Sequence, residues 1–106
     1  MNVLFVCNQA QHRSPTAEEI FSEKYDTNCA GIYSEDKPVT AQLMKWADTI
    51  VCMEEVQRKW IVENYGKYTL SIRLVVLEIP DVYRYMQEEL ITQLQNKMKQ
   101  YRVIKI

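Results

Sequence analysis

The loop from Cys7 to Arg13 holds the residues of this sequence that are best suited to chemistry. Five residues separate the cysteine from the arginine, and a loop of this length can curl until its backbone N–H groups point into one concavity. Such a concavity suits the oxygens of a phosphate group, and the Arg13 guanidinium adds a planar, bidentate donor. The same positive field favours the nucleophilic thiolate form of Cys7. The spacing therefore predicts a phosphate site with a reactive thiol.

The residues after this loop support the interpretation. Ser14-Pro15 is typical of an N-cap followed by the first residue of a helix, and this helix would direct the positive end of its dipole at the loop. Ser14 can also donate a hydrogen bond to a thiolate at Cys7. The alternative is that Cys7 is a small buried hydrophobic residue and Arg13 a surface residue.

An acid that protonates the leaving group is expected farther along the chain. Asp81 follows the last predicted strand, so it emerges at the same edge of a parallel sheet as Cys7. It can protonate a departing oxygen and then deprotonate a water molecule. Tyr83 is the best candidate for the wall of an aromatic slot. Two alternatives stay open: Asp81 is a turn residue after Pro80, or Glu78 is the acid.

Two kinds of apolar segment alternate along the chain and must position these residues. Short continuous runs, typical of strands buried on both faces, occur at 3–6, 49–53 and 74–77, with a weaker candidate at 28–32. The order β-α-β-α-β-α-β-α predicts a three-layer α/β/α fold with a four-stranded parallel sheet and the Cys7 loop at the carboxyl end of strand 1. The helical segments show apolar residues three and four positions apart: Ala17, Ile20, Phe21 and Tyr25; Leu43, Met44 and Ala47 behind a Thr40 cap; Val56, Trp60 and Ile61; and Met86, Leu90, Leu94, Met98 and Tyr101.

Length and composition exclude several other classes of protein. The 106 residues predict one domain over 1–106, and a net charge of −1 gives no overall positive field for nucleic acid or an anionic membrane. Two glycines are too few for glycine-rich nucleotide loops, and one histidine without metal-ligand spacing argues against a metal site. No cofactor is indicated. Three cysteines without a signal-like apolar run predict a cytoplasmic protein with free thiols.

The segments 3–7 and 13–18 closely resemble the N-terminus of the low-molecular-weight protein tyrosine phosphatases. Ala30-Gly31 and the segment 47–53 extend the resemblance, which covers the rest of the chain more weakly. A short bacterial branch of about this length, with an Ile-Pro-Asp-x-Tyr segment, is the most similar. The resemblance implies phosphomonoester hydrolysis through a phosphocysteine, with a phosphorylated protein or a small phosphomonoester as substrate and phosphotyrosine as the expected group.

The resemblance also implies roles for individual residues. Cys7 would be the nucleophile, Arg13 the phosphate clamp, Ser14 the partner of the thiolate and Asp81 the general acid and base. The backbone N–H groups of five residues would line the phosphate cradle: Asn8, Gln9, Ala10, Gln11 and His12.

The loop also departs from the family pattern. Gln9 and Ala10 stand where relatives carry glycine or asparagine, and alanine does not adopt positive φ without strain. We therefore expect a strained loop and slow turnover. His12 stands where many relatives have a second cysteine, so a protective disulfide is not expected. Neither Gly31 nor Gly66 lies in the loop, and we expect neither to contribute to it.

Three other functions stay open. An arsenate reductase shares this fold but needs resolving thiols, whereas Cys29 and Cys52 lie in expected buried strands. A phosphocysteine carrier would lack the Arg-Ser-Pro sequence after the loop. A weakly active or inactive phosphate-binding relative is suggested by Ala10. The oligomeric state is not indicated, although Ile104 and Ile106 are apolar enough to contact a partner.

Overall fold

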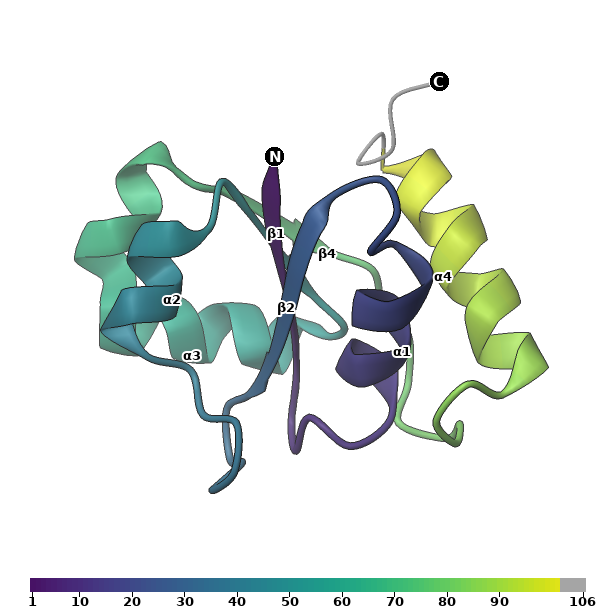
Figure 1. Ribbon diagram of the computed structural model, residues 1–106. Coiled ribbons are helices and arrows are strands. Elements are labelled where there is room, and N and C mark those ends of the chain that lie inside the picture. The colour runs from purple at the N-terminus through teal and green to yellow at the C-terminus, as the bar shows by residue number, and fades with distance from the viewer. Residues whose placement is uncertain (102–106) are drawn as a thin grey trace.

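A four-stranded parallel sheet forms the centre of the molecule in the computed structural model, which describes residues 1–101 (Figure 1). Its strands lie in the order β2-β1-β3-β4, and each neighbouring pair is parallel. The predicted sheet is therefore confirmed, including its weakest strand. Because β2 and β3 flank β1, Cys7 lies where the strand order reverses, which is where open α/β sheets bind ligands. The strands are β1 (Asn2–Cys7), β2 (Asp26–Gly31), β3 (Thr49–Cys52) and β4 (Arg73–Val76).

Helices cover both faces of the sheet, as the three-layer prediction requires (Figure 1). Alternate residues of β1 supply the two cores because successive strand side chains point to opposite faces. Phe5 packs in one core with α1 and α4, and Leu4 packs in the other with α2 and α3. The helices are α1 (Arg13–Ile20), α2 (Ala41–Trp46), α3 (Glu55–Tyr65) and α4 (Glu88–Gln100), with a short 3₁₀ helix η1 (Gly66–Ser71) after α3.

Two helix starts test the capping predictions with different results. Thr40 caps α2 as expected, since its side chain accepts a hydrogen bond from the Leu43 N–H at 3.1 Å. The prediction for α1 is wrong, because the helix begins at Arg13 with His12 as its N-cap. Pro15 is the third helical residue. It is tolerated there because the first four N–H groups of a helix have no intrahelical acceptor.

The apolar stripes predicted for α3 and α4 are confirmed in part. In α3, Ile61 is fully buried but Val56 is 45% exposed, and the buried neighbour is Gln57. This polar residue is tolerated in the interior because both ends of its amide are hydrogen bonded. In α4 the inward positions Leu90, Leu94 and Met98 are fully buried, whereas Met86 lies before the helix and is 38% exposed.

Two further expectations concern membranes and partners. Across residues 1–101, the helices are all too short or too polar to cross a membrane. Ile104 and Ile106, named above as candidates for a partner contact, lie outside the described residues.

Candidate active site

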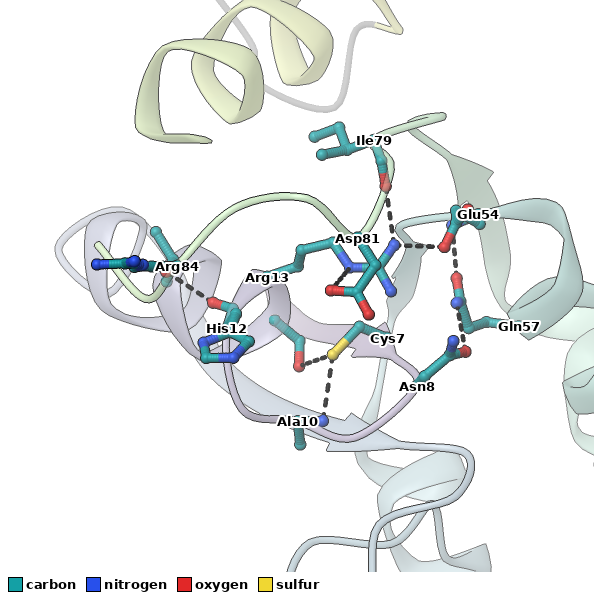
Figure 2. Close-up of polar contacts among 12 residues, drawn as sticks. Cys7, Asn8, Ala10, His12, Arg13, Glu54, Gln57, Ile79, Asp81 and Arg84 are labelled. Atoms are coloured by element: carbon teal, nitrogen blue, oxygen red, sulfur yellow. Dashed lines mark hydrogen bonds and ion pairs between the residues drawn. The ribbon is translucent and has the colours of Figure 1, made fainter. Parts of the chain in front are cut away.

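Cys7 ends β1 beneath the loop that follows, and its thiol is buried. Two polar groups contact the sulfur (Figure 2). Ser14 Oγ lies 3.0 Å from Cys7 Sγ, and the Ala10 N–H donates to the same sulfur at 3.2 Å. A thiolate at Cys7 can accept a hydrogen bond from both groups, and such charge-assisted bonds are stronger than neutral ones. Ser14 therefore contacts the sulfur and does not cap the helix.

The loop returns to the sulfur through a strained residue. Ala10 has φ 56°, in the left-handed region that costs a residue with a Cβ about 1–2 kcal/mol. The strain expected at this position is confirmed. This turn brings the Ala10 N–H within reach of Cys7.

Gly31 supports the loop from the neighbouring strand. It pairs in register with Cys7, and just beyond it the Tyr33 N–H donates to the Asn8 carbonyl at 2.8 Å. A Cβ on Gly31 would lie 2.6 Å from Asn8 O, 2.7 Å from Gln9 C and 2.8 Å from Ala10 N. The expectation that this glycine contributes nothing is therefore wrong, because the loop backbone occupies the space of the missing side chain.

The Arg13 guanidinium is buried and its orientation is fixed by acceptors. Its Nη1 donates to Glu54 Oε1 at 2.5 Å and to the Ile79 carbonyl at 2.8 Å, while its Nε lies 3.7 Å from Asp81 Oδ1 (Figure 2). Both hydrogens of Nη1 are thus engaged. The edge formed by Nε and Nη2 is the one that can donate two parallel bonds to an oxyanion.

Glu54 and Gln57 belong to the site, although sequence reasoning missed them. The Gln57 amide accepts from the Glu54 N–H at 2.5 Å and donates to Asn8 Oδ1 at 2.8 Å. The Asn8 side chain therefore points toward Gln57 and is held by it (Figure 2). Two features of the sequence could have identified these residues. Glu54 follows the end of β3 at the same sheet edge as Cys7, and Glu54-x-x-Gln57 has the spacing of a capping box.

A cavity of about 150 Å³ brings the predicted catalytic residues together. Glu78, the alternative acid, is directed elsewhere, since its carboxylate accepts from the Tyr101 hydroxyl at 3.3 Å. Tyr83 is not among the lining residues and packs, half-buried, against the core cluster that includes α1 and α4. The lining residues are Cys7, Gln9, Gln11, His12, Arg13 and Asp81.

A larger cavity of about 600 Å³ adjoins this one. Gln9 and Gln11 line both cavities, and Ala10 lines the larger one. Its opposite wall is the segment 33–37, whose first residue, Tyr33, is 56% exposed. A group attached to an oxyanion held in the smaller cavity would therefore have space on this side.

The two remaining cysteines are buried in the sheet. Burial, followed by the nearby Glu18 carboxylate, raises the pKa of Cys29 to about 11. Burial raises the pKa of Cys52 to about 12. Both thiols therefore stay protonated and unreactive near neutral pH. Within the described part of the chain, no cluster of three or more His, Cys, Asp or Glu side chains is arranged to hold a metal ion.

Comparison with known proteins gives a fold but no sequence family. No protein-family model and no curated protein sequence matches the chain. Solved structures of bacterial phosphatases are similar along nearly the whole chain. The tyrosine phosphatase Wzb from Escherichia coli K30, in complex with phosphate, has 18% identity and a TM-score of 0.72 over 94% of each chain.

Two further structures cover similar shares of this chain. The YwlE arginine phosphatase from Geobacillus stearothermophilus has 15% identity and a TM-score of 0.70 over 96% of this chain and 93% of that one. A low-molecular-weight protein tyrosine phosphatase from Bacillus subtilis has 23% identity and a TM-score of 0.63 over 96% of this chain and 99% of that one. The resemblance seen in the sequence is thus confirmed for the architecture: this chain has the fold of the low-molecular-weight protein tyrosine phosphatases.

Proposed function

We propose that this protein is a cysteine-dependent phosphatase that hydrolyses phosphomonoesters, with phosphotyrosine as the expected substrate group. The observation that carries the proposal is the cavity shared by Cys7, Arg13 and Asp81. Its fold, shared with tyrosine and arginine phosphatases, gives independent support.

The first chemical step transfers the phosphoryl group to sulfur. The Nε–Nη2 edge of Arg13 and the N–H groups of the loop hold the phosphate oxygens. The Cys7 thiolate attacks phosphorus, the bond from phosphorus to the leaving oxygen breaks, and Asp81 gives its proton to that oxygen. Positive groups fixed around the cradle stabilise the charge that develops on the phosphoryl oxygens.

The second step hydrolyses the phosphocysteine. Asp81, now a carboxylate, takes a proton from water as the water oxygen attacks phosphorus. The phosphorus–sulfur bond breaks and the electron pair returns to Cys7 Sγ, where Ser14 Oγ and the Ala10 N–H contact the sulfur. These contacts favour departure of the thiolate.

The other functions considered above receive less support. Arsenate reduction requires accessible resolving thiols, and both Cys29 and Cys52 are buried with raised pKa values. A carrier must protect its phosphocysteine from water, whereas Asp81 lies in the same cavity as Cys7. A weakly active phosphate-binding relative remains the second candidate because Ala10 is strained.

Kinetics with three substrates test the proposal: an aryl phosphate, a phosphotyrosine peptide and a phosphoarginine peptide. Cys7→Ser should abolish turnover, and Asp81→Asn should lower kcat by about 10²–10⁴-fold. Glu78→Gln is the matched control for the acid and should retain wild-type activity, because its carboxylate contacts Tyr101. Equal rates for the wild type and Cys7→Ser would refute the proposal. Phosphate binding without turnover by the wild type would favour the second candidate.

A further inference from the structure

The Thr16 hydroxyl joins two parts of the chain that are distant in sequence. Thr16 is fully buried in the first turn of α1. Its Oγ1 donates to the His12 carbonyl at 2.7 Å and accepts from the Met86 N–H at 2.9 Å. A hydroxyl has one hydrogen to donate, so the bond to His12 leaves a lone pair free for Met86. Thr16 thus links the end of the phosphate loop to the approach of α4.

The segment that it holds is the one that carries Asp81. Residues 80–87 belong to the connection 77–87 between β4 and α4, contain no regular helix or strand, and run beside α1 (Figure 1). The near end is fixed at Ile79, whose N–H donates to the Met53 carbonyl and whose carbonyl accepts from Arg13. The far end is fixed by the bond from Met86 to Thr16. The two residues of α1 that hold this segment, Arg13 and Thr16, therefore both lie in the first turn of the helix.

The backbone at the far anchor needs a contact to hold it. Met86 has φ 59°, a left-handed conformation that is unfavourable for a residue with a side chain. Its side chain is 38% exposed, so its burial supplies only part of the restraint. The bond from the Met86 N–H to a fully buried hydroxyl supplies a directional restraint.

We propose that Thr16 is a positioning residue for the general acid: its hydroxyl fixes the segment 80–87 so that Asp81 faces the phosphate cavity. The inference rests on the proposed function, because it assigns Thr16 an effect that acts through Asp81. A general acid accelerates cleavage most when the leaving oxygen is strongly basic. Loss of the Thr16 hydroxyl should therefore slow cleavage of substrates with basic leaving groups and spare those with weakly basic ones.

The test compares Thr16→Val, which keeps the shape and removes both bonds, with Thr16→Ser, which keeps the hydroxyl. Thr27→Val is the matched control, since the Thr27 hydroxyl donates to the Glu18 carbonyl of the same helix at 2.9 Å. For Thr16→Val we expect kcat/KM, which reports the steps up to formation of the phosphocysteine, to fall by about tenfold or more for phenyl phosphate and to change by less than about threefold for 4-nitrophenyl phosphate. Inhibition by inorganic phosphate should be unchanged. Thr16→Ser and Thr27→Val should behave as the wild type.

Two kinetic results would overturn the inference while the proposed function stands. One is an equal fall of kcat/KM for both substrates in Thr16→Val, and the other is failure of Thr16→Ser to retain activity on phenyl phosphate. A wild type that hydrolyses neither substrate would overturn the proposed function and with it the role of Asp81 as acid.

The anchor itself has a readout that does not depend on turnover. Hydrogen exchange at the Met86 amide should accelerate in Thr16→Val and stay slow in Thr16→Ser and Thr27→Val. Unchanged exchange in Thr16→Val would show that the hydroxyl does not hold the segment, whatever the activity.

Discussion

The two glycines of the chain give a matched pair of substitutions that tests how the phosphate loop is supported. Gly31 touches the backbone of the loop, whereas nothing lies within 4 Å of a Cβ built on Gly66. Gly66 also has ordinary helical angles, φ −52° and ψ −37°. An alanine methyl group should therefore have opposite effects at the two positions.

The size of the effect at Gly31 follows from three contacts. The shortest is 2.6 Å, and ordinary contacts of a Cβ begin at 3.4 Å, so the atoms must separate by 3.4 − 2.6, about 0.8 Å. All three neighbours are backbone atoms, which cannot rotate away as a side chain can. Overpacking of this kind costs about 1–3 kcal/mol. A displacement near 1 Å in a catalytic loop lowers kcat/KM by about 10²-fold.

Thermal unfolding and aryl phosphate kinetics measure both effects. Gly31→Ala should lower Tm by at least about 4 °C and kcat/KM by about 10²-fold, with its circular dichroism spectrum unchanged. Gly66→Ala should raise Tm by about 2–8 °C and leave kcat/KM unchanged. Wild-type kcat/KM and an unchanged Tm in Gly31→Ala would refute the reasoning that this glycine makes room for the loop.

Three further predictions concern strain, the buried amide and the thiols. Ala10→Gly should raise Tm by about 4 °C, because glycine adopts φ 56° without strain; a lower Tm would contradict this. Gln57→Leu should lower the free energy of unfolding in urea by about 1–3 kcal/mol, because Asn8 Oδ1 loses its partner; a loss below about 0.5 kcal/mol would count against the network. The raised pKa values of Cys29 and Cys52 imply that, above the ordinary thiol pKa of about 9, the unfolded chain loses thiol protons that the folded chain keeps. The free energy of unfolding should therefore fall as the pH rises from about 9 toward 12, and the double variant Cys29→Ala/Cys52→Ala should flatten this slope.

The sheet was predictable because its strands are buried on both faces. Continuous apolar runs separated by helical stripes leave few arrangements other than a parallel α/β sheet. Because parallel strands end at the same edge of the sheet, the predicted strands were enough to place Cys7 and Asp81 near each other. The structure gives these two residues and Arg13 a common cavity.

The supporting residues could not be predicted from local patterns. Glu54, Gln57 and Gly31 act across neighbouring strands, so their importance depends on which atoms meet in space. The start of α1 was misplaced for a related reason. A proline fits any position of the first turn, so Pro15 could not distinguish the N-cap from the positions beside it.

Several contacts of the candidate site are made by neighbouring residues in the first turn of α1. These contacts limit where residues can be inserted into the chain. Arg13 contacts Glu54 and Ile79, Ser14 contacts Cys7, and Thr16 contacts Met86. One residue inserted among them would rotate the rest of the helix by about 100° and separate these side chains from their partners. The segment 33–37, which lines the large cavity, is held at its ends, where the Tyr33 N–H donates to the Asn8 carbonyl and the Lys37 carbonyl accepts from Gly31, but Glu35 and Asp36 between these ends are exposed. Insertions that alter substrate preference are therefore best directed there, with the length of α1 kept fixed.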